Sequence, residues 1–160
     1  MKFISHRGNL NGKNPDEENS ISYIDKAYKI TQHVEIDVRF KKNKWYLGHD
    51  SKYTTEVDFD YIKRDGFWLH CKNIEALLEL QGSKLNYFWH QKDAYTLTSH
   101  NFIWCYPGKA VPSKDFETIA VLPELNNTNI VNFSGVCSDH IVKYKNMANF
   151  GITKDRNLSS

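Results

Sequence analysis

The stretch VEIDVR, residues 34–39, decides how the chain folds, because its apolar and charged residues alternate with a period of two. In a β-strand this alternation places the three apolar residues on one face and the three charged residues on the other, Glu35, Asp37 and Arg39. A strand that buries charges needs a compensating partner, since an unpaired buried charge is costly. The two carboxylates therefore indicate a bound divalent cation, and a solvated face of an edge strand is the alternative reading.

Short apolar segments of the same kind recur along the chain, separated by polar loops or by single helices. We expect strands at residues 3–6, 34–39, 45–48, 67–71, 86–90, 95–98, 102–106, 118–122 and 135–138. Helices are expected at residues 20–30, 73–80 and 141–149. A strand–helix–strand order is typical of parallel βαβ units, and a complete (β/α) barrel takes about 250 residues. With 160 residues, the chain is expected to form a minimal, helix-depleted TIM-type barrel of the α/β class.

Composition limits the classes of protein that the chain can represent. A formal net charge of +2 argues against a nucleic-acid-binding protein held by a large basic patch. The sequence has neither an apolar leader nor a run long enough to span a membrane, and its three cysteines fit no zinc motif. We therefore expect a cytoplasmic protein with buried thiols, one domain over residues 1–150 and a frayed tail over residues 151–160.

Polar residues cluster where the expected strands end. His6 and Arg7 end the first strand, His49 follows the strand at 45–48, and Lys72 follows the strand at 67–71. The carboxyl ends of parallel strands meet at one edge of a sheet or barrel, and active sites form there. We therefore expect these side chains to lie close to the carboxylates of the 34–39 strand.

Four short motifs occur in a fixed order in the first third of the chain: HRG at 6–8, EN at 18–19, EIDV at 35–38 and HD at 49–50. In this order they resemble the glycerophosphodiester phosphodiesterase family. The segments LHCK at 69–72 and GVCSD at 135–139 extend the resemblance more loosely.

The resemblance implies two catalytic histidines, two metal-binding carboxylates and two phosphate-binding cations, respectively His6 and His49, Glu35 and Asp37, and Arg7 and Lys72. Glu18 or His70 would complete the metal shell. The family has a glutamate where this chain has His70, and an imidazole favours manganese or zinc over magnesium or calcium. The implied cofactor is a divalent ion, Mg, Ca or Mn, with Zn possible because of His70.

The second half of the chain adds residues at strand ends that can line a substrate pocket or bind phosphate: Trp89, His90, Tyr106, Lys109 and Glu124. Aromatic faces at these positions suit stacking on a sugar ring, although Trp89 and Trp104 can equally fill the core. His33, His100 and His140 are expected in loops or on the surface.

These expectations together predict a metal-dependent phosphoric diester hydrolase in lipid or polysaccharide metabolism. Its substrate would be a small glycerophosphodiester-like or sugar-phosphodiester molecule, cleaved by histidine general acid–base catalysis. A phosphate-ester-binding module without catalytic activity and a lyase that releases a cyclic phosphate are the alternatives. Strands without outer helices would expose apolar surface, so a homodimer is also expected.

Overall fold

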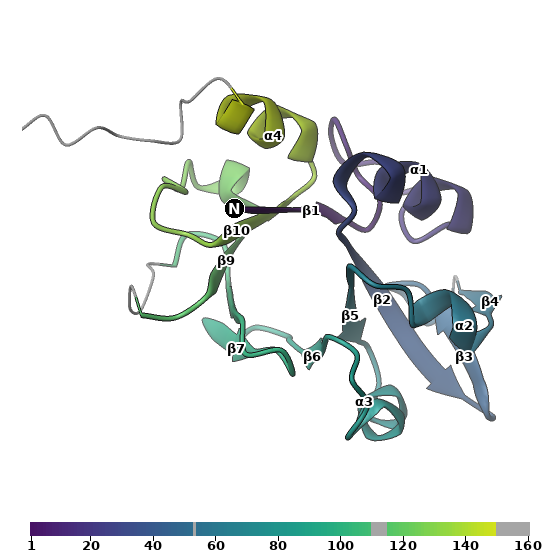
Figure 1. Cartoon of the computed structure of the whole chain (residues 1–160). Coiled ribbons are helices and arrows are strands. Elements are labelled where there is room, and N and C mark those ends of the chain that lie inside the picture. The colour runs from purple at the N-terminus through teal and green to yellow at the C-terminus, as the bar shows by residue number, and fades with distance from the viewer. Residues whose placement is uncertain (53, 110–114, 150–160) are drawn as a thin grey trace, which may run out of the picture.

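A computed structural model of the chain describes residues 1–52, 54–109 and 115–149 (Figure 1). The tail expected at 151–160 lies outside the described residues. The strands within them are β1 (Lys2–His6), β2 (Val34–Lys41), β3 (Lys44–Leu47), β4 (Thr55–Val57), β5 (Phe67–Cys71), β6 (Tyr87–Trp89), β7 (Tyr95–Leu97), β8 (Ile103–Cys105), β9 (Thr118–Val121) and β10 (Gly135–Ser138). The helices are α1 (Ile21–Thr31), α2 (Phe59–Ile62), α3 (Ile74–Leu80) and α4 (Ile141–Asn149), with a 3₁₀ turn η1 (Pro123–Leu125).

The strands form one curled, mixed sheet (Figure 1). Parallel pairs run in the order β6-β5-β2-β1-β10-β9-β8. The first half of the long strand β2 lies between β1 and β5, and its second half pairs with the antiparallel strand β3, which in turn pairs with β4. At the other end of the run, β7 pairs antiparallel with β8. The parallel strands therefore bring their carboxyl ends to one edge of the curl.

The expected TIM-type barrel is wrong. The structure is a half-barrel built from a curled ten-stranded sheet, and its described residues contain four short helices, which do not follow every parallel strand. A (β/α) barrel needs a helix after each parallel strand. Here the chain passes from β6 to β8 through the hairpin strand β7, and the described part of the connection from β9 to β10 contains only the turn η1.

Most of the individual elements lie where the sequence pattern places them. The strand at 67–71 and the helix at 141–149 match their expected limits, and the first helix is displaced by one residue. β4 and α2 were not expected, because residues 55–62 show no sustained period of two or of 3.6 residues. No helix in the described ranges combines the length and apolar character needed to cross a membrane.

The two faces of the sheet carry different cores. The outer face packs against the helices, for example through Ile36, Leu69 and Val136. The inner face of the curl is filled by its own cluster, Ile4, Trp68, Phe88, Trp104, Ile119, Val121 and Cys137. All three cysteines are buried and free, as expected.

The inner cluster contains a continuous column of aromatic rings. The centroids of Phe102 and Trp68 lie 4.9 Å apart, those of Trp68 and Trp104 5.8 Å, and those of Trp104 and Phe88 4.7 Å. Phe88 stacks in turn on the imidazole of His70 at 4.9 Å. The interior of the curl is therefore a packed apolar core, and the polar side chains of the inner face lie at the ends of the strands.

Candidate functional site

A cavity of ≈ 820 Å³ opens at the carboxyl edge of the parallel strands. It brings together most of the residues that the sequence pattern selected. Its lining includes His6, Arg7, Glu35, His49, His70, Lys72, His90, Tyr106 and Asp139.

A buried cluster of Glu35, Asp37 and His70 can hold a metal ion, since one ligand atom from each residue lies within 4.8 Å of the others. Parallel pairing of β2 and β5 sets Asp37 beside His70. The His70 Nδ1 atom lies 3.2 Å from both Glu35 Oε1 and Asp37 Oδ1. The other oxygen, Glu35 Oε2, is buried without a hydrogen-bond partner in the described part of the chain. Two carboxylates, one imidazole and an unsatisfied buried oxygen therefore fit a divalent cation.

The orientation of His70 suits it to be a ligand. Its Nε2–H donates a hydrogen bond to the backbone carbonyl of His90 at 2.8 Å, and its ring lies nearly parallel to that of Phe88, at an interplanar angle of 12°. This contact directs Nδ1 towards the carboxylates. Burial lowers the pKa of His70, but its hydrogen bonds to Asp37 and Glu35 outweigh burial and raise the pKa to about 9. A cation that binds at neutral pH must therefore displace a proton from Nδ1.

Asp37 is completely buried, and polar groups surround it. Its backbone N–H donates to Asn19 Oδ1, and Asn19 Nδ2 donates to its Oδ2, both at 2.9 Å. The Oδ2 atom lies 2.8 Å from Arg7 Nε and 3.3 Å from His49 Nδ1, and Lys72 Nζ lies 3.8 Å from Oδ1. Burial would raise the pKa of Asp37, but hydrogen bonds from two histidines and the charge of Arg7 hold it well below its usual value. Asp37 is therefore an anion in the folded protein.

His6 forms a close pair with Asp139, across the β1–β10 pairing. His6 Nδ1 lies 2.6 Å from Asp139 Oδ1, which also accepts a hydrogen bond from Asn9 Nδ2 at 2.8 Å. The opposite nitrogen, His6 Nε2, lies 3.9 Å from Glu35 Oε2. Burial lowers the pKa of His6, but the Asp139 hydrogen bond and the charge of Glu35 together raise it above its usual value. One nitrogen is thus fixed by a carboxylate, and the other lies beside the metal cluster.

The turn after β1 presents Arg7 to the cavity. Arg7 adopts a left-handed backbone with φ of 55°, and its guanidinium donates to Glu18 Oε2 at 3.2 Å and to His49 Nδ1 at 2.7 Å. The next residue, Gly8, has φ of 94°, and a Cβ there would lie 2.6 Å from the ring of Tyr23 on α1. The glycine of the HRG motif is therefore required by both its backbone conformation and the close packing of the turn on the helix.

The charges at this edge do not balance without protonation or a cation. Within the ion-pair network, four carboxylates face two permanent cations: Glu18, Glu35, Asp37 and Asp139 against Arg7 and Lys72. Lys13, Lys92 and Asp93 also line the cavity but lie outside this network. Two negative charges remain, and either protonation of His6 and His70 or one divalent cation would neutralise them. The electrostatics of the site therefore couple metal binding to the protonation of the histidines.

Three of the expected pocket and phosphate residues do not line the cavity. Trp89 packs against the outer core, because period-two alternation turns Phe88 and His90 inwards and the residue between them outwards. Lys109 is exposed and lies outside the lining. Glu124 accepts hydrogen bonds from Ser138 Oγ at 2.9 Å and from the backbone N–H of Asp139 at 3.0 Å. Glu124 therefore holds the end of β10 and does not contact the cavity.

His90 and Tyr106, in contrast, lie in the cavity as expected, with ring centroids 5.8 Å apart. His90 is buried, and its Nδ1 has no hydrogen-bond partner among the described residues. Burial and the charge of His70 lower the pKa of His90, so its imidazole is neutral at physiological pH.

Three polar residues organise the site without having been expected there, Asp139, Asn9 and Asn19, although the motifs GVCSD and EN contain Asp139 and Asn19. Asp139 directly follows β10, so the strand-end argument that selected His6 also selects Asp139. The two asparagines lie in the loop between β1 and α1, where no periodic pattern distinguishes them from ordinary turn residues.

Comparison with known proteins adds no family to this description. No protein-family model matches the chain, and no curated protein sequence matches it significantly.

Proposed function

We propose that the chain is a metal-dependent phosphoric diester hydrolase, similar in its motifs to the glycerophosphodiester phosphodiesterases. Its proposed substrate is a small glycerophosphodiester-like or sugar-phosphodiester molecule. One observation carries the proposal: the buried Glu35–Asp37–His70 cluster, with an unsatisfied carboxylate oxygen, shares a cavity with the His6–Asp139 pair and with two cations. Together these groups supply the three needs of phosphodiester cleavage, which are charge neutralisation, positioning and proton transfer.

Arg7 and Lys72 are the proposed phosphate-binding residues. A phosphodiester carries one negative charge, and cleavage increases the charge on its non-bridging oxygens. A divalent ion held by Glu35, Asp37 and His70 would add Lewis-acid stabilisation of that charge. Arg7 and Lys72 line the same cavity and lie against Asp37, so their positions are fixed before the substrate binds.

His6 and His49 are the proposed proton-transfer residues. Asp139 and Glu35 raise the pKa of His6, which favours the protonated form that can donate to the oxygen of the leaving alcohol. His49 lies at the rim, with half of its side chain exposed. It would accept the proton from the attacking water or substrate hydroxyl as the phosphorus–oxygen bond to the leaving group breaks.

Hydrolysis of bis-p-nitrophenyl phosphate tests this function. The purified protein is assayed in EDTA and then with Mg, Ca, Mn or Zn, while a thermal melt reports metal binding in each condition. We expect turnover and stabilisation with at least one ion, strongest with Mn or Zn because of His70, and loss of both in Glu35→Gln. Glu56→Gln, which removes an exposed carboxylate paired with Lys44, is the matched control. Turnover that persists in EDTA or in Glu35→Gln would contradict the proposal.

A binding module without catalytic activity is the second candidate, and the contacts of Asp37 favour it. Arg7, His49, His70 and Lys72 already lie close to this carboxylate, so the cluster can be neutralised without a metal when its histidines are protonated. Such a module would be stabilised by phosphate esters in EDTA and would show no metal-dependent turnover. If turnover occurs, detection of a cyclic phosphate product would indicate a lyase.

A further inference from the structure

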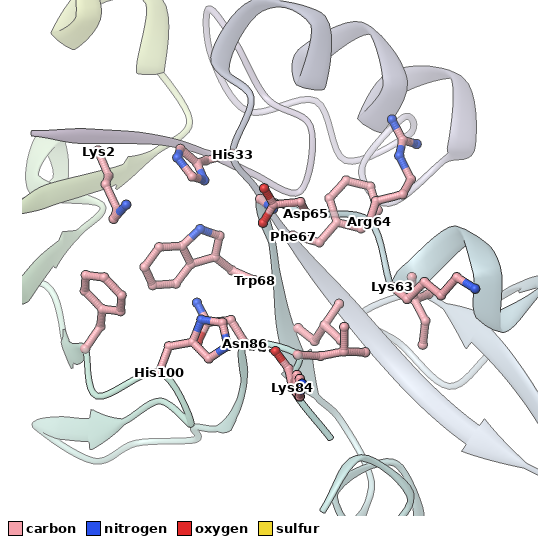
Figure 2. A pocket seen from close by; sticks show the side chains of 15 residues that line it. Lys2, His33, Lys63, Arg64, Asp65, Phe67, Trp68, Lys84, Asn86 and His100 are labelled. Atoms are coloured by element: carbon pink, nitrogen blue, oxygen red, sulfur yellow. Dashed lines mark hydrogen bonds between the residues drawn. The ribbon is translucent and has the colours of Figure 1, made fainter. Parts of the chain in front are cut away.

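A second cavity, of ≈ 270 Å³, lies at the opposite, amino-terminal edge of the strands. Figure 2 shows side chains from segments far apart in the sequence gathering around the indole of Trp68: Lys2 from β1, His33 from the segment before β2, Asn86 from the segment before β6, and His100 from the turn between β7 and β8. Lys63 and Arg64 extend away from this group in the same view. The strands that form the candidate metal site thus carry a separate polar cavity at their other end.

Two polar groups of this cavity are buried without a partner. Asn86 is 8% exposed, and its Oδ1 has no hydrogen-bond partner among the described residues. The Nδ1 atom of His33 is also buried without a hydrogen-bond partner among the described residues. A buried polar group without a partner typically costs about 1–3 kcal/mol. Native proteins rarely retain this cost unless water or a ligand satisfies the group.

The charges that line the cavity are mainly positive. Four cations and one carboxylate contribute to it: Lys2, Lys63, Arg64 and Lys84, and Asp65. Lys63 pairs with Asp60 and Arg64 with Asp25, whereas Lys2 and Lys84 form no ion pair within the described ranges. Asp65 is engaged as a turn residue, with its Oδ1 accepting from the backbone N–H of Gly66. Burial and the charge of Lys2 lower the pKa of His33, so its imidazole is neutral at physiological pH and adds no charge to the cavity.

We propose that this cavity is a binding site for a small oxyanion, a carboxylate or a phosphate. Lys2 supplies the charge, and the Asn86 amide and the neutral His33 imidazole each supply one N–H. The Asn86 amide can rotate by 180° to present its NH₂ group, since the two ends of an amide have nearly the same shape. Trp68 and Phe102 form an apolar wall, which suits an oxyanion carried on a small organic group. The volume lies near the lower end of the usual range for ligand pockets, so the ligand is small.

Isothermal titration of the full chain with sodium phosphate, and separately with sodium acetate, tests the site. EDTA is present throughout, so that a metal at the other edge cannot bind the anion. We expect saturable binding of at least one of the two anions, weakened about tenfold or more in Lys2→Met and in Asn86→Leu, because each removes a hydrogen bond to a charged group. Lys63→Met removes a lysine from the same lining, but one already paired with Asp60, and should leave binding unchanged.

The arms of the experiment separate the two edges of the molecule. Binding of phosphate but not acetate would assign a phosphate-bearing ligand, and binding of both would assign a general oxyanion site. If binding is lost in Lys72→Met and unaffected in Lys2→Met, the anion occupies the carboxyl edge and the proposal is wrong. It is also wrong if neither anion binds at about 10 mM, ten times a millimolar dissociation constant. Thermal melts of each variant show whether it is folded, and Lys2→Met is informative even if Asn86→Leu fails to fold.

Discussion

The two ends of the parallel strands carry opposite kinds of polar chemistry. At the carboxyl edge, the ion-pair network contains more carboxylates than permanent cations, and its side chains pair with one another, as Asp37 pairs with Arg7 and His70. At the amino edge, cations outnumber carboxylates in the cavity lining, and the buried atoms Asn86 Oδ1 and His33 Nδ1 have no hydrogen-bond partner within the described residues. Both edges therefore keep buried polar atoms without a partner in the described residues, Glu35 Oε2 and His90 Nδ1 at the carboxyl edge and the two atoms above at the amino edge, but only the carboxyl edge surrounds them with a network of ion pairs.

The same alternation generates both edges and the core between them. Along β5, Trp68 belongs to the inner core and His70, two residues further on, belongs to the metal cluster. Along the β6 segment, the inward positions pass from Asn86 through Phe88 to His90. A strand of five residues can therefore place a core residue and a site residue on one face.

Replacing a histidine should abolish activity at one edge and have no effect on it at the other. We expect His6→Gln to lower kcat/KM for bis-p-nitrophenyl phosphate by about 10²–10⁴-fold, the usual contribution of a general acid or base. His100→Gln, the same substitution at the amino edge, should leave kcat/KM unchanged. An equal loss of kcat/KM in both variants would contradict the assignment of catalysis to the carboxyl edge.

His70 should make the metal-free protein's stability depend on pH. Its folded-state pKa of about 9 lies above the ordinary value of 6.5. The protonated form therefore contributes stability that is fully present below pH 6.5 and is lost as pH rises through about 9. In EDTA, we expect the difference in free energy of unfolding between the wild type and His70→Gln to decrease by about 3 kcal/mol as the pH rises from 6.5 to about 9. Urea unfolding at a series of pH values measures it, and a constant difference between the two proteins would contradict the prediction.

Asp139→Asn should alter the pH profile as well as the rate. Loss of the carboxylate lowers the pKa of His6, because the Asp139 hydrogen bond raises it in the wild type. The limb of the profile that requires protonated His6 should then move to lower pH. We expect kcat to fall by about 10–100-fold, the effect of losing one charge-assisted hydrogen bond. A profile that keeps its wild-type midpoints would show that Asp139 has only a structural role.

Two Asn→Leu substitutions compare an amide that bonds through both of its ends with one whose oxygen has no partner among the described residues. Asn73 bonds to both the backbone N–H and the carbonyl of Phe40, so Asn73→Leu should destabilise the protein by about 1–3 kcal/mol. Asn86→Leu removes an amide whose Oδ1 has no partner among the described residues and should be neutral or stabilising, by up to about 1 kcal/mol, in anion-free buffer. Chemical denaturation of both variants measures the difference. A comparable loss in both would show that the Asn86 amide is already satisfied.

Local patterns predicted much of the site, since they depend only on alternation and on where each strand ends. Glu35 and Asp37 share an inner face, and Arg7, His49 and Lys72 lie beside them, as the order of strand ends indicates. The same alternation also predicts that Trp89 faces outwards, because its neighbour His90 faces inwards and successive strand residues point to opposite faces. Asn19 could not be found in this way, since its role depends on a contact with the distant strand β2.

The overall fold was less predictable, because it depends on what fills the spaces between strands. Short strands such as 86–90 and 102–106 were correctly identified, as was the strand at 95–98 that forms a hairpin with 102–106, but this hairpin was not expected to replace a barrel element. The expected barrel assumed that helices had been deleted from a closed ring. In the structure, the aromatic rings of Trp68, Phe88 and Trp104 fill the inner face of the curl.

The aromatic column gives the protein an optical property of its own. Trp68 lines the cavity at the amino edge, Trp104 lines the cavity at the carboxyl edge, and their ring centroids are 5.8 Å apart. Each site thus has an indole in its wall, and indole emission responds to a change of charge or polarity nearby. A paramagnetic ion such as Mn²⁺ beside His70 should quench the emission of Trp104, whereas diamagnetic Zn²⁺ at the same position should only shift it. Fluorescence of Trp68→Phe and Trp104→Phe variants would then identify, without any added label, which end of the sheet a small molecule has reached.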